Sequence, residues 1–275
     1  MDRSKVPAVL SIAGSDSSGG AGIQADIKTI TAHRLYAQTA ITAITAQNTL
    51  GVTAVQDISP DIVAAQIDAV FDDIRPSAVK IGMVSSVEII DVIADRLSAW
   101  KATNVVVDPV MVATSGARLI AEDAAEALTR RLFPLATVIT PNIPEAMALL
   151  DYEVDSERTQ QNAAMLLTRR FGCASLVKVG ILSTRPTMYW PNPRHSMTRQ
   201  PSGRSTHHVV PPQAHRDRQH ARHRMHALVR HRLRAGSGHG SCRRRQRRQG
   251  IPDRRSGRRL NMGKGSGPVN HMWQY

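Results

Sequence analysis

Residues 13–26 read Ala-Gly-Ser-Asp-Ser-Ser-Gly-Gly-Ala-Gly-Ile-Gln-Ala-Asp and join an apolar run, Val9–Ala13, to a segment with helical spacing. The glycines Gly19, Gly20 and Gly22 permit positive φ angles and a close approach of the backbone to another group. A tight turn between a strand and a helix explains them equally well. The stretch is neither a Walker A motif nor a dinucleotide fingerprint. On spacing alone, it indicates only that a small ligand can lie against the backbone here.

Beyond this turn, short apolar runs alternate with segments of helical periodicity as far as residue 182. Such alternation is typical of a mostly parallel sheet flanked by helices, so we predict an α/β fold for this part of the chain. Right-handed crossovers place the strand ends along one edge of the sheet, where ligands of such folds bind. The strand-like runs are 9–13, 39–46, 79–81, 105–108, 137–140 and 176–179.

The charge of the chain is divided unevenly. Residues 1–182 carry 15 Lys and Arg against 20 Asp and Glu, a net charge of −5. Residues 183–275 carry 21 basic against 2 acidic groups, a net charge of +19, and hold ten of the eleven histidines. Because this second part lacks periodic apolar residues, we expect residues 183–259 to be irregular or disordered.

The cysteine content and the hydropathy pattern bear on the compartment. The two cysteines, Cys173 and Cys242, are too few for a disulfide framework and have no metal-binding spacing. No charged and then apolar leader opens the chain, and no apolar run approaches the roughly 20 residues that span a bilayer. We therefore expect a cytoplasmic protein without a membrane partner.

Polar side chains follow several of the predicted strands. Gln47 can both donate to and accept from the edge of a heteroaromatic ring. Asp108, at the end of a buried run, is suited to Mg²⁺ or to a phosphate-bound water. Each residue also has a structural alternative: a loop amide for Gln47, a helix cap for Asp108 or Glu145, and a solvated side chain for Lys178. Taken singly, they do not decide between a binding site and a structural role.

Taken together and in this order, the motifs resemble those of the hydroxymethylpyrimidine/phosphomethylpyrimidine kinases of thiamine biosynthesis, members of the ribokinase-like superfamily. The Gly-rich opening is the most specific of them, and the resemblance covers about residues 6–182. It implies a ribokinase-like fold. It also implies ATP-dependent phosphorylation of 4-amino-5-hydroxymethyl-2-methylpyrimidine and then of its monophosphate, with a pyridoxal-type kinase as the alternative. The motifs that follow at the family's spacing are Ala46–Thr49, Lys80–Met83, Asp108–Met111 and Thr140–Glu145.

The resemblance further implies which residues form the site. It suggests ATP and Mg²⁺ as cofactors and a homodimer as the assembly. One departure lies at Val179–Ile181, where the family usually carries Gly-Gly-His. The residues implied for the pyrimidine pocket are Gly14, Ala21, Asp26, Gln47, Met83 and Val110. Those implied for the side that binds ATP and Mg²⁺ are Asp108, Asn142, Glu145 and Lys178.

The family's catalytic turn, Gly-Thr-Gly-Cys at a helix N-terminus, occurs nowhere in the chain. In the family, its backbone N–H groups and helix dipole hold the transferring phosphate, and its Cys is assigned as the base. Cys242 lies in Gly-Ser-Cys-Arg-Arg-Arg, which does not match this turn. We therefore assign no catalytic residue. We expect the chain as written either to be a catalytically inactive pyrimidine-binding protein or to fail to fold.

The genetic code offers a reason for this loss. Read one nucleotide later, with permitted codon choices, residues 218–228 spell Ala-Asn-Thr-His-Gly-Thr-Gly-Cys-Thr-Leu. The Cys is the most constrained position, because Met225 followed by His226 gives TGC whichever His codon is used. A family-like ending, Gly-Pro-Val-Asn-His, returns at residues 267–271. We thus expect an incomplete kinase core at 1–182, an out-of-frame basic segment at 183–259 and a family-like end at 260–275.

A functional arginine-rich arm is the rival interpretation of the basic segment. Arginine-rich arms bind nucleic acid through counterion release, and Arg243–Arg248 has the required composition. The segment has almost no aromatic residues for base stacking, and its preference for Arg over Lys is what a shifted GC-rich frame gives. We expect no specific nucleic-acid partner, and non-specific polyanion binding only.

Overall fold

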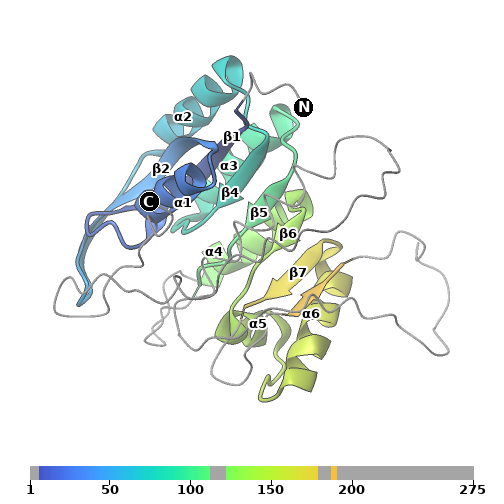
Figure 1. The fold of residues 1–275 in the computed structure, drawn as a ribbon. Helices are drawn as coiled ribbons and strands as arrows, with labels where there is room; N and C mark the ends of the chain where they lie inside the picture. The colour runs from blue at the N-terminus through green and yellow to red at the C-terminus, as the bar shows by residue number, and fades with distance from the viewer. Residues whose placement is uncertain (1–5, 112–121, 179–186, 191–275) are drawn as a thin grey trace, which may run out of the picture.

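A computed structural model of the protein describes residues 6–111, 122–178 and 187–190 and has one central sheet (Figure 1). Within these residues, the strand order is β3-β2-β1-β4-β5-β6-β7-β8. All neighbouring pairs from β2 to β7 are parallel, while the edge strands β3 and β8 run antiparallel to their neighbours. The mostly parallel α/β architecture predicted from the sequence is thereby confirmed.

The elements alternate along the chain as the hydrophobic pattern predicts. The strands are β1 (Ala8–Asp16), β2 (Tyr36–Gln47), β3 (Val52–Asp57), β4 (Ala78–Ile81), β5 (Val105–Val107), β6 (Val138–Ile139), β7 (Ala174–Val177) and β8 (Thr187–Tyr189). The helices are α1 (Gly22–Ala32), α2 (Pro60–Asp73), α3 (Val87–Ala99), α4 (Glu122–Ala127), α5 (Ile143–Leu150) and α6 (Glu157–Phe171), with a π-helical turn, η1 (Leu128–Leu132), and a 3₁₀ turn, η2 (Phe133–Leu135), after α4.

Local sequence signals fix where several helices begin and end. The Ser86 hydroxyl caps α3 by accepting from the backbone N–H of Ile89. α6 begins with a capping box between Ser156 and Thr159 and ends at Gly172, whose φ of 72° suits a residue without a Cβ. These caps satisfy backbone groups that have no partner within the helix, so the boundaries follow from the side chains present.

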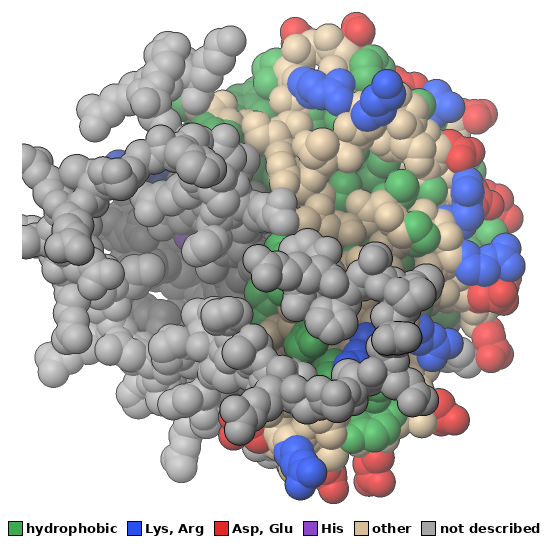
Figure 2. Space-filling model, turned by 90° about the vertical axis from the view of Figure 1, so that its right-hand side faces the viewer, with side chains coloured by type: hydrophobic (Ala, Val, Ile, Leu, Met, Phe, Trp, Pro, Cys, Tyr) green, Lys and Arg blue, Asp and Glu red, His purple; other side chains and the backbone are tan. Residues whose placement is uncertain are grey.

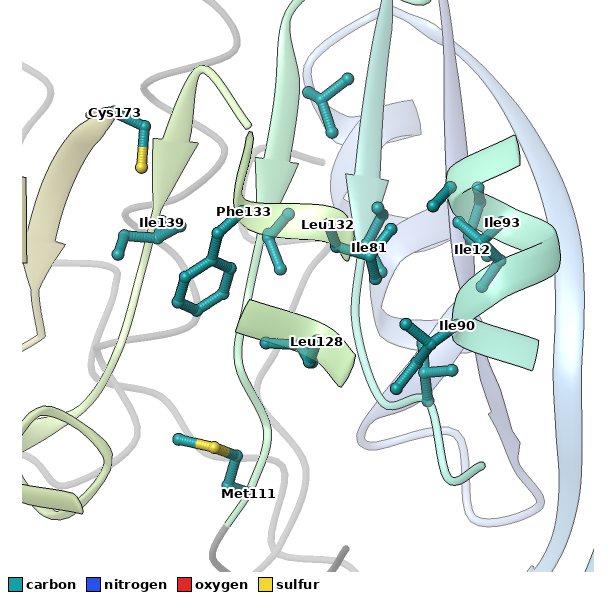
Figure 3. Packing of buried hydrophobic residues seen from close by; sticks show 14 of the residues in the cluster. Ile12, Ile81, Ile90, Ile93, Met111, Leu128, Leu132, Phe133, Ile139 and Cys173 are labelled. Carbon is teal, nitrogen blue, oxygen red and sulfur yellow. The ribbon is translucent and has the colours of Figure 1, made fainter. Parts of the chain in front are cut away.

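The main core lies on one face of the sheet, beneath α2, α3, η1, α5 and α6. Figure 3 shows Ile12 and Ile81 of the sheet beside Ile90 and Ile93 of α3, with the ring of Phe133 nearby. Each of these aliphatic side chains is fully buried, which stabilises the fold by roughly 1.5–3 kcal/mol per residue. This core packs against the strands up to the edge where they end.

The opposite face carries α1 and two smaller apolar clusters. Ile30 of α1 packs against the strands at Val9, Ala78 and Val106. Farther along the sheet lies a second small cluster, formed by Val138, Ala174 and Leu176. The sheet is therefore apolar on both faces, as buried parallel strands require.

Two edge strands depart from the sequence-based expectation. Thr187–Tyr189 lie within the range expected to be irregular, yet they form β8 and pair with β7 from Ser175 to Val177. A β-branched residue and an aromatic residue in a three-residue run favour this extended pairing. β3 was not predicted because all six of its residues are exposed, so it has no buried alternation. The rest of 183–259, and all of 260–275, lie outside the described residues.

The surface of the described part carries charges of both signs. On the face drawn in Figure 2, acidic and basic side chains intermingle and no single sign dominates. Among the described helices, none combines the length and the apolar character needed to cross a bilayer.

Candidate active site

The predicted site residues gather at the edge of the sheet where the parallel strands end. Gly14 lies in β1, Gln47 ends β2, and Met83 follows β4. Asp108 directly follows β5 and Lys178 directly follows β7. Since the strand order is β2-β1-β4-β5-β6-β7, the residues implied for the pyrimidine pocket occupy one half of this edge. Those implied for the nucleotide occupy the other half, and the two halves meet at β5.

The Gly-rich loop is organised around the buried carboxylate of Asp16. Its Oδ1 accepts from the backbone N–H and the hydroxyl of Ser18, each at 2.8 Å. Its Oδ2 accepts from the backbone N–H groups of Gly20, at 3.1 Å, and Ala21, at 2.7 Å. A carboxylate of the chain itself therefore uses three backbone N–H groups of the loop that precedes α1. These three N–H groups are not available to an anion bound at the loop.

Two glycines of this region are required by close packing. A Cβ atom on Gly14 would lie 2.8 Å from the Cε atom of Met83, so a larger residue there would require the end of the Met83 side chain to move. Gly22 has a φ of 53°, and a Cβ atom there would overlap the carbonyl oxygen of Gly14. These contacts place Gly14 between the start of α1 and Met83.

Gln47 lies at the rim of this pocket. Ser17 ties it to the Gly-rich loop, because the Ser17 hydroxyl donates to the Gln47 carbonyl at 2.7 Å and accepts from its N–H at 2.8 Å. The side-chain Oε1 of Gln47 accepts from the hydroxyl of Thr45 at 3.3 Å. Gln47, Met83 and Val110 are each half-buried, which leaves part of every side chain open to a ligand.

Asp26 is held on the inner side of α1. Its Oδ2 atom accepts from the hydroxyl of Ser11 and from the ammonium of Lys80, each at 2.6 Å. Sequence reasoning did not assign Ser11 or Lys80 to the site. A signal was nevertheless present, because a lysine inside the buried run of β4 requires a buried partner.

Asp108, Glu145 and Lys178 form a second buried cluster at the ends of β5 and β7. The Lys178 ammonium is in direct ion-pair contact with Asp108 Oδ1 and lies 3.8 Å from Glu145 Oε2. Thr140 at the end of β6 donates to Asp108 Oδ1 at 3.2 Å. Lys178 is therefore buried and paired, not solvated. The cluster thus holds two buried carboxyl groups beside one ammonium at the edge where the strands end.

Glu145 has a double role at this cluster. Its Oε2 accepts from the backbone N–H of Asn142 at 2.7 Å, and the Asn142 side chain accepts from the N–H of Glu145 at 2.8 Å. This capping box starts α5, so the capping interpretation of Glu145 is confirmed. Burial raises the pKa of Glu145 to about 7, opposed by the nearby Lys178 and reinforced by Asp108. A carboxyl with this pKa changes its charge near neutral pH.

Cys173 does not replace the missing catalytic cysteine. It is buried beside the main core (Figure 3). Burial raises the pKa of its thiol to about 11, so the thiol stays protonated at neutral pH. Cys242, and residues 218–228, over which a shifted reading frame was predicted, lie outside the described residues.

Comparisons with known proteins agree with this geometry. The family model for phosphomethylpyrimidine kinase matches residues 16–207. Over 198 residues, the chain is 50% identical to the hydroxymethylpyrimidine/phosphomethylpyrimidine kinase of Rhizobium meliloti (strain 1021), covering 71% of this chain and 73% of that protein. It is 49% identical over 174 residues to the thiamine biosynthesis bifunctional protein ThiED of Geobacter sulfurreducens, covering 63% of this chain and 36% of that protein.

Solved structures show the same similarity. A phosphomethylpyrimidine kinase from Clostridium difficile 630 is 45% identical with a TM-score of 0.64, and the match covers 68% of this chain and 82% of that one. The pyridoxal kinase of Bacillus subtilis, solved as an ADP complex, is 36% identical with a TM-score of 0.61, covering 68% of this chain and 72% of that one.

Proposed function

The chain belongs to the phosphomethylpyrimidine kinase family, and on this premise we propose that its site serves an ATP-dependent phosphorylation in thiamine biosynthesis. The acceptor is 4-amino-5-hydroxymethyl-2-methylpyrimidine, followed by its monophosphate. The observation that carries the proposal is the junction at β5. There, the half with Gly14 and Met83 adjoins the half with Asp108 and Lys178. A hydroxymethyl group and a triphosphate bound on either side would meet at this point.

The pocket half is suited to a flat, neutral heterocycle. Gly14 and Met83 pack against each other near the ends of β1 and β4, and the half-buried amide of Gln47 can satisfy the ring edge. Because Asp16 already uses the N–H groups of Ser18, Gly20 and Ala21, we expect the phosphates of ATP to bind at the other half. In this arrangement, one half of the site recognises the ring and the other half binds the charged phosphates.

The nucleotide half fits Mg²⁺ together with ATP. Asp108 and Glu145 supply the hard oxygen donors that Mg²⁺ prefers, and Mg²⁺ would neutralise the charge on the phosphates when bound. The ammonium of Lys178 offers a point charge to a phosphate oxygen. Asn142 starts α5 beside them. The Bacillus subtilis neighbour was solved as an ADP complex, which supports nucleotide binding by a chain of this fold.

The chain as written lacks the anion hole and the base, so it binds its substrates without turning them over. The out-of-frame segment at 183–259 removes the Gly-Thr-Gly-Cys turn, and phosphoryl transfer depends on such positioned N–H groups. Calorimetry with the pyrimidine and a coupled ATPase assay test this on the full chain. Binding without turnover is expected, and a normal kinase rate from this chain would refute it.

The origin of the segment is tested at the level of the gene. Resequencing across codons 180–262 shows whether compensating insertions and deletions are present. A gene whose frame is restored across this range should yield a chain with Gly-Thr-Gly-Cys and with kinase activity. An unaltered frame in the genome, together with an inactive restored chain, would reject the frameshift explanation.

A pyridoxal-type kinase is the second candidate activity. It is favoured by the similarity to the pyridoxal kinase of Bacillus subtilis at 36% identity. Side-by-side turnover of the two substrates by the restored chain separates the two activities, and we expect preference for the pyrimidine because the family match is to phosphomethylpyrimidine kinase. A preference for pyridoxal would reverse the assignment.

Two further partners belong to the proposal. A second copy of the chain can pack on the ribbon of β2 and β3, where Ile44, Leu50, Val52 and Val55 are exposed. Sedimentation of the full chain, compared with a variant carrying Val55→Asp, tests this homodimer.

The basic segment at 183–259 binds polyanions without sequence preference. Weak binding to heparin that disappears at moderate salt is the expected result.

A further inference from the structure

Three polar side chains from three elements meet inside the protein beneath the Gly-rich loop. Ser11 comes from β1, Asp26 from α1 and Lys80 from β4. The Ser11 hydroxyl and the Lys80 ammonium both donate to Asp26 Oδ2, each at 2.6 Å. All three residues are buried, with Ser11 completely enclosed. This cluster is separate from the cluster of Asp108, Glu145 and Lys178.

The cluster is costly to bury. Lys80 lies in the middle of a strand whose four residues are all buried. An ion pair in such a place gains little over an apolar pair of the same shape, so stability alone is a weak reason for its presence. Both donors reach the same oxygen, and among the described residues no hydrogen bond uses Asp26 Oδ1. The cluster therefore holds the carboxylate in one orientation and leaves one oxygen available.

The cluster adjoins the pocket half of the site. A Cβ atom placed on Gly82 would lie 2.6 Å from the Lys80 Nζ atom and 3.0 Å from the Cβ of Ala13. Gly82 is followed by Met83, whose Cε atom lies against Gly14. The glycine at position 82 therefore leaves room for the ammonium directly beside the pocket.

We propose that Lys80 and Ser11 are positioning residues that orient Asp26 to accept a hydrogen bond from the amino group of the pyrimidine ring. The inference rests on the proposed function, because it takes Asp26 as a pocket residue. A carboxylate oxygen held in place accepts from an exocyclic amine and repels a ring that presents an oxygen instead. The pair thereby selects an amino-substituted ring over its oxo analogue.

Calorimetry on the full chain tests the inference with two ligands, 4-amino-5-hydroxymethyl-2-methylpyrimidine and the analogue with oxygen at ring position 4. The variants are Lys80→Met, Ser11→Ala, and Lys80→Met combined with Asp26→Asn. Arg96→Met is the matched control, because it breaks an ion pair with Asp68 whose side chains are 40% and 39% exposed. The quantity compared is the ratio of the two dissociation constants.

The expected result is a change in this ratio. Lys80→Met should lower the preference for the amino ring by up to roughly tenfold, because Asp26 is no longer held in one orientation and the hydrogen bond to the ring amine, worth about that factor, is weakened. Ser11→Ala should lower it less, and Arg96→Met should leave it unchanged. The double variant leaves no unpaired buried charge, so it should fold as well as the unaltered chain and still lack the preference.

Other outcomes overturn the inference and can be told apart. If Lys80→Met lowers the free energy of unfolding but leaves the ratio unchanged, the cluster is only structural. If the double variant keeps the full preference for the amino ring, Asp26 does not read that group. If the unaltered chain binds neither ring, the proposed function itself fails and the inference falls with it.

Discussion

Replacing Lys178 by methionine tests the electrostatics of the nucleotide half most directly. The change removes the ammonium that contacts Asp108 Oδ1 and lies 3.8 Å from Glu145 Oε2. The side chains of Lys178 and Asp108 are each 9% exposed, and that of Glu145 is 2% exposed. Two carboxyl groups are then left together in the interior without a cation.

The expected loss of stability follows from this burial. Exposed ion pairs contribute at most about 1 kcal/mol, whereas removing one partner of a buried pair costs roughly 3–5 kcal/mol. Glu145, with its pKa of about 7, can take up a proton and relieve part of the repulsion. The uncompensated charge is then mainly that of Asp108, so we expect a loss of about 3 kcal/mol at pH 7.

Urea unfolding of the full chain at pH 7 without divalent cations measures this loss. Arg130→Gln is the control, because its pair with Glu126 joins side chains that are 72% and 66% exposed; the expected cost is below about 0.5 kcal/mol. Adding Asp108→Asn to Lys178→Met should recover much of the loss. A cost for Lys178→Met within about 1 kcal/mol, equal to that of the control pair, would refute the argument.

Three further predictions concern single residues. Gly22→Ala should destabilise the chain by more than about 1 kcal/mol in urea unfolding, because of its φ of 53° and the overlap with Gly14, whereas Gly51→Ala, with open space around it, should not. Glu145→Gln should flatten the pH dependence of the free energy of unfolding. The pKa of Glu145 in the folded chain, about 7, lies above its ordinary value of 4.5, so the unaltered chain should lose up to about 3 kcal/mol of stability as the pH rises from about 4.5 to 7. An unchanged slope in the variant would contradict this. Asp16→Ala should free the N–H groups at the start of α1 and create weak binding of inorganic phosphate, detectable by calorimetry and absent from the unaltered chain.

Much of the fold could be predicted from the hydrophobic pattern, because its strands are buried. The runs expected at 79–81 and 105–108 match β4 and β5 within a residue, since every position in these strands is in the core. The run expected at 39–46 is shorter than β2, because the ends of that strand are partly exposed. β3 escaped prediction for the same reason. The hydrophobic periodicity of a sequence reflects which residues are buried, so exposed strands show little periodicity.

The site was less predictable than the fold. Asp108 and Lys178 each lie at the end of a predicted strand, so they were expected at the same edge of the sheet, and the structure places them in contact. The pattern did not show that Asp26 pairs with Lys80, because 54 residues separate them and the contact depends on how α1 crosses the sheet. Nor did the pattern show that backbone N–H groups of the Gly-rich loop donate to Asp16, because these contacts depend on the path of the loop. Side-chain partners across elements are set by tertiary geometry, which local spacing does not contain.

The order of the strands in the sheet bears on how the protein is made. From β1 through β4, β5, β6 and β7 to β8, each strand lies beside the one that precedes it in this series. A ribosome therefore delivers each new strand to an edge that is already built, and domains fold from the N-terminus during synthesis. The pocket half of the sheet, β1 to β4, therefore emerges before the codons for residues 183–275 are read. The nascent chain can accordingly begin to fold before its basic part has been synthesised.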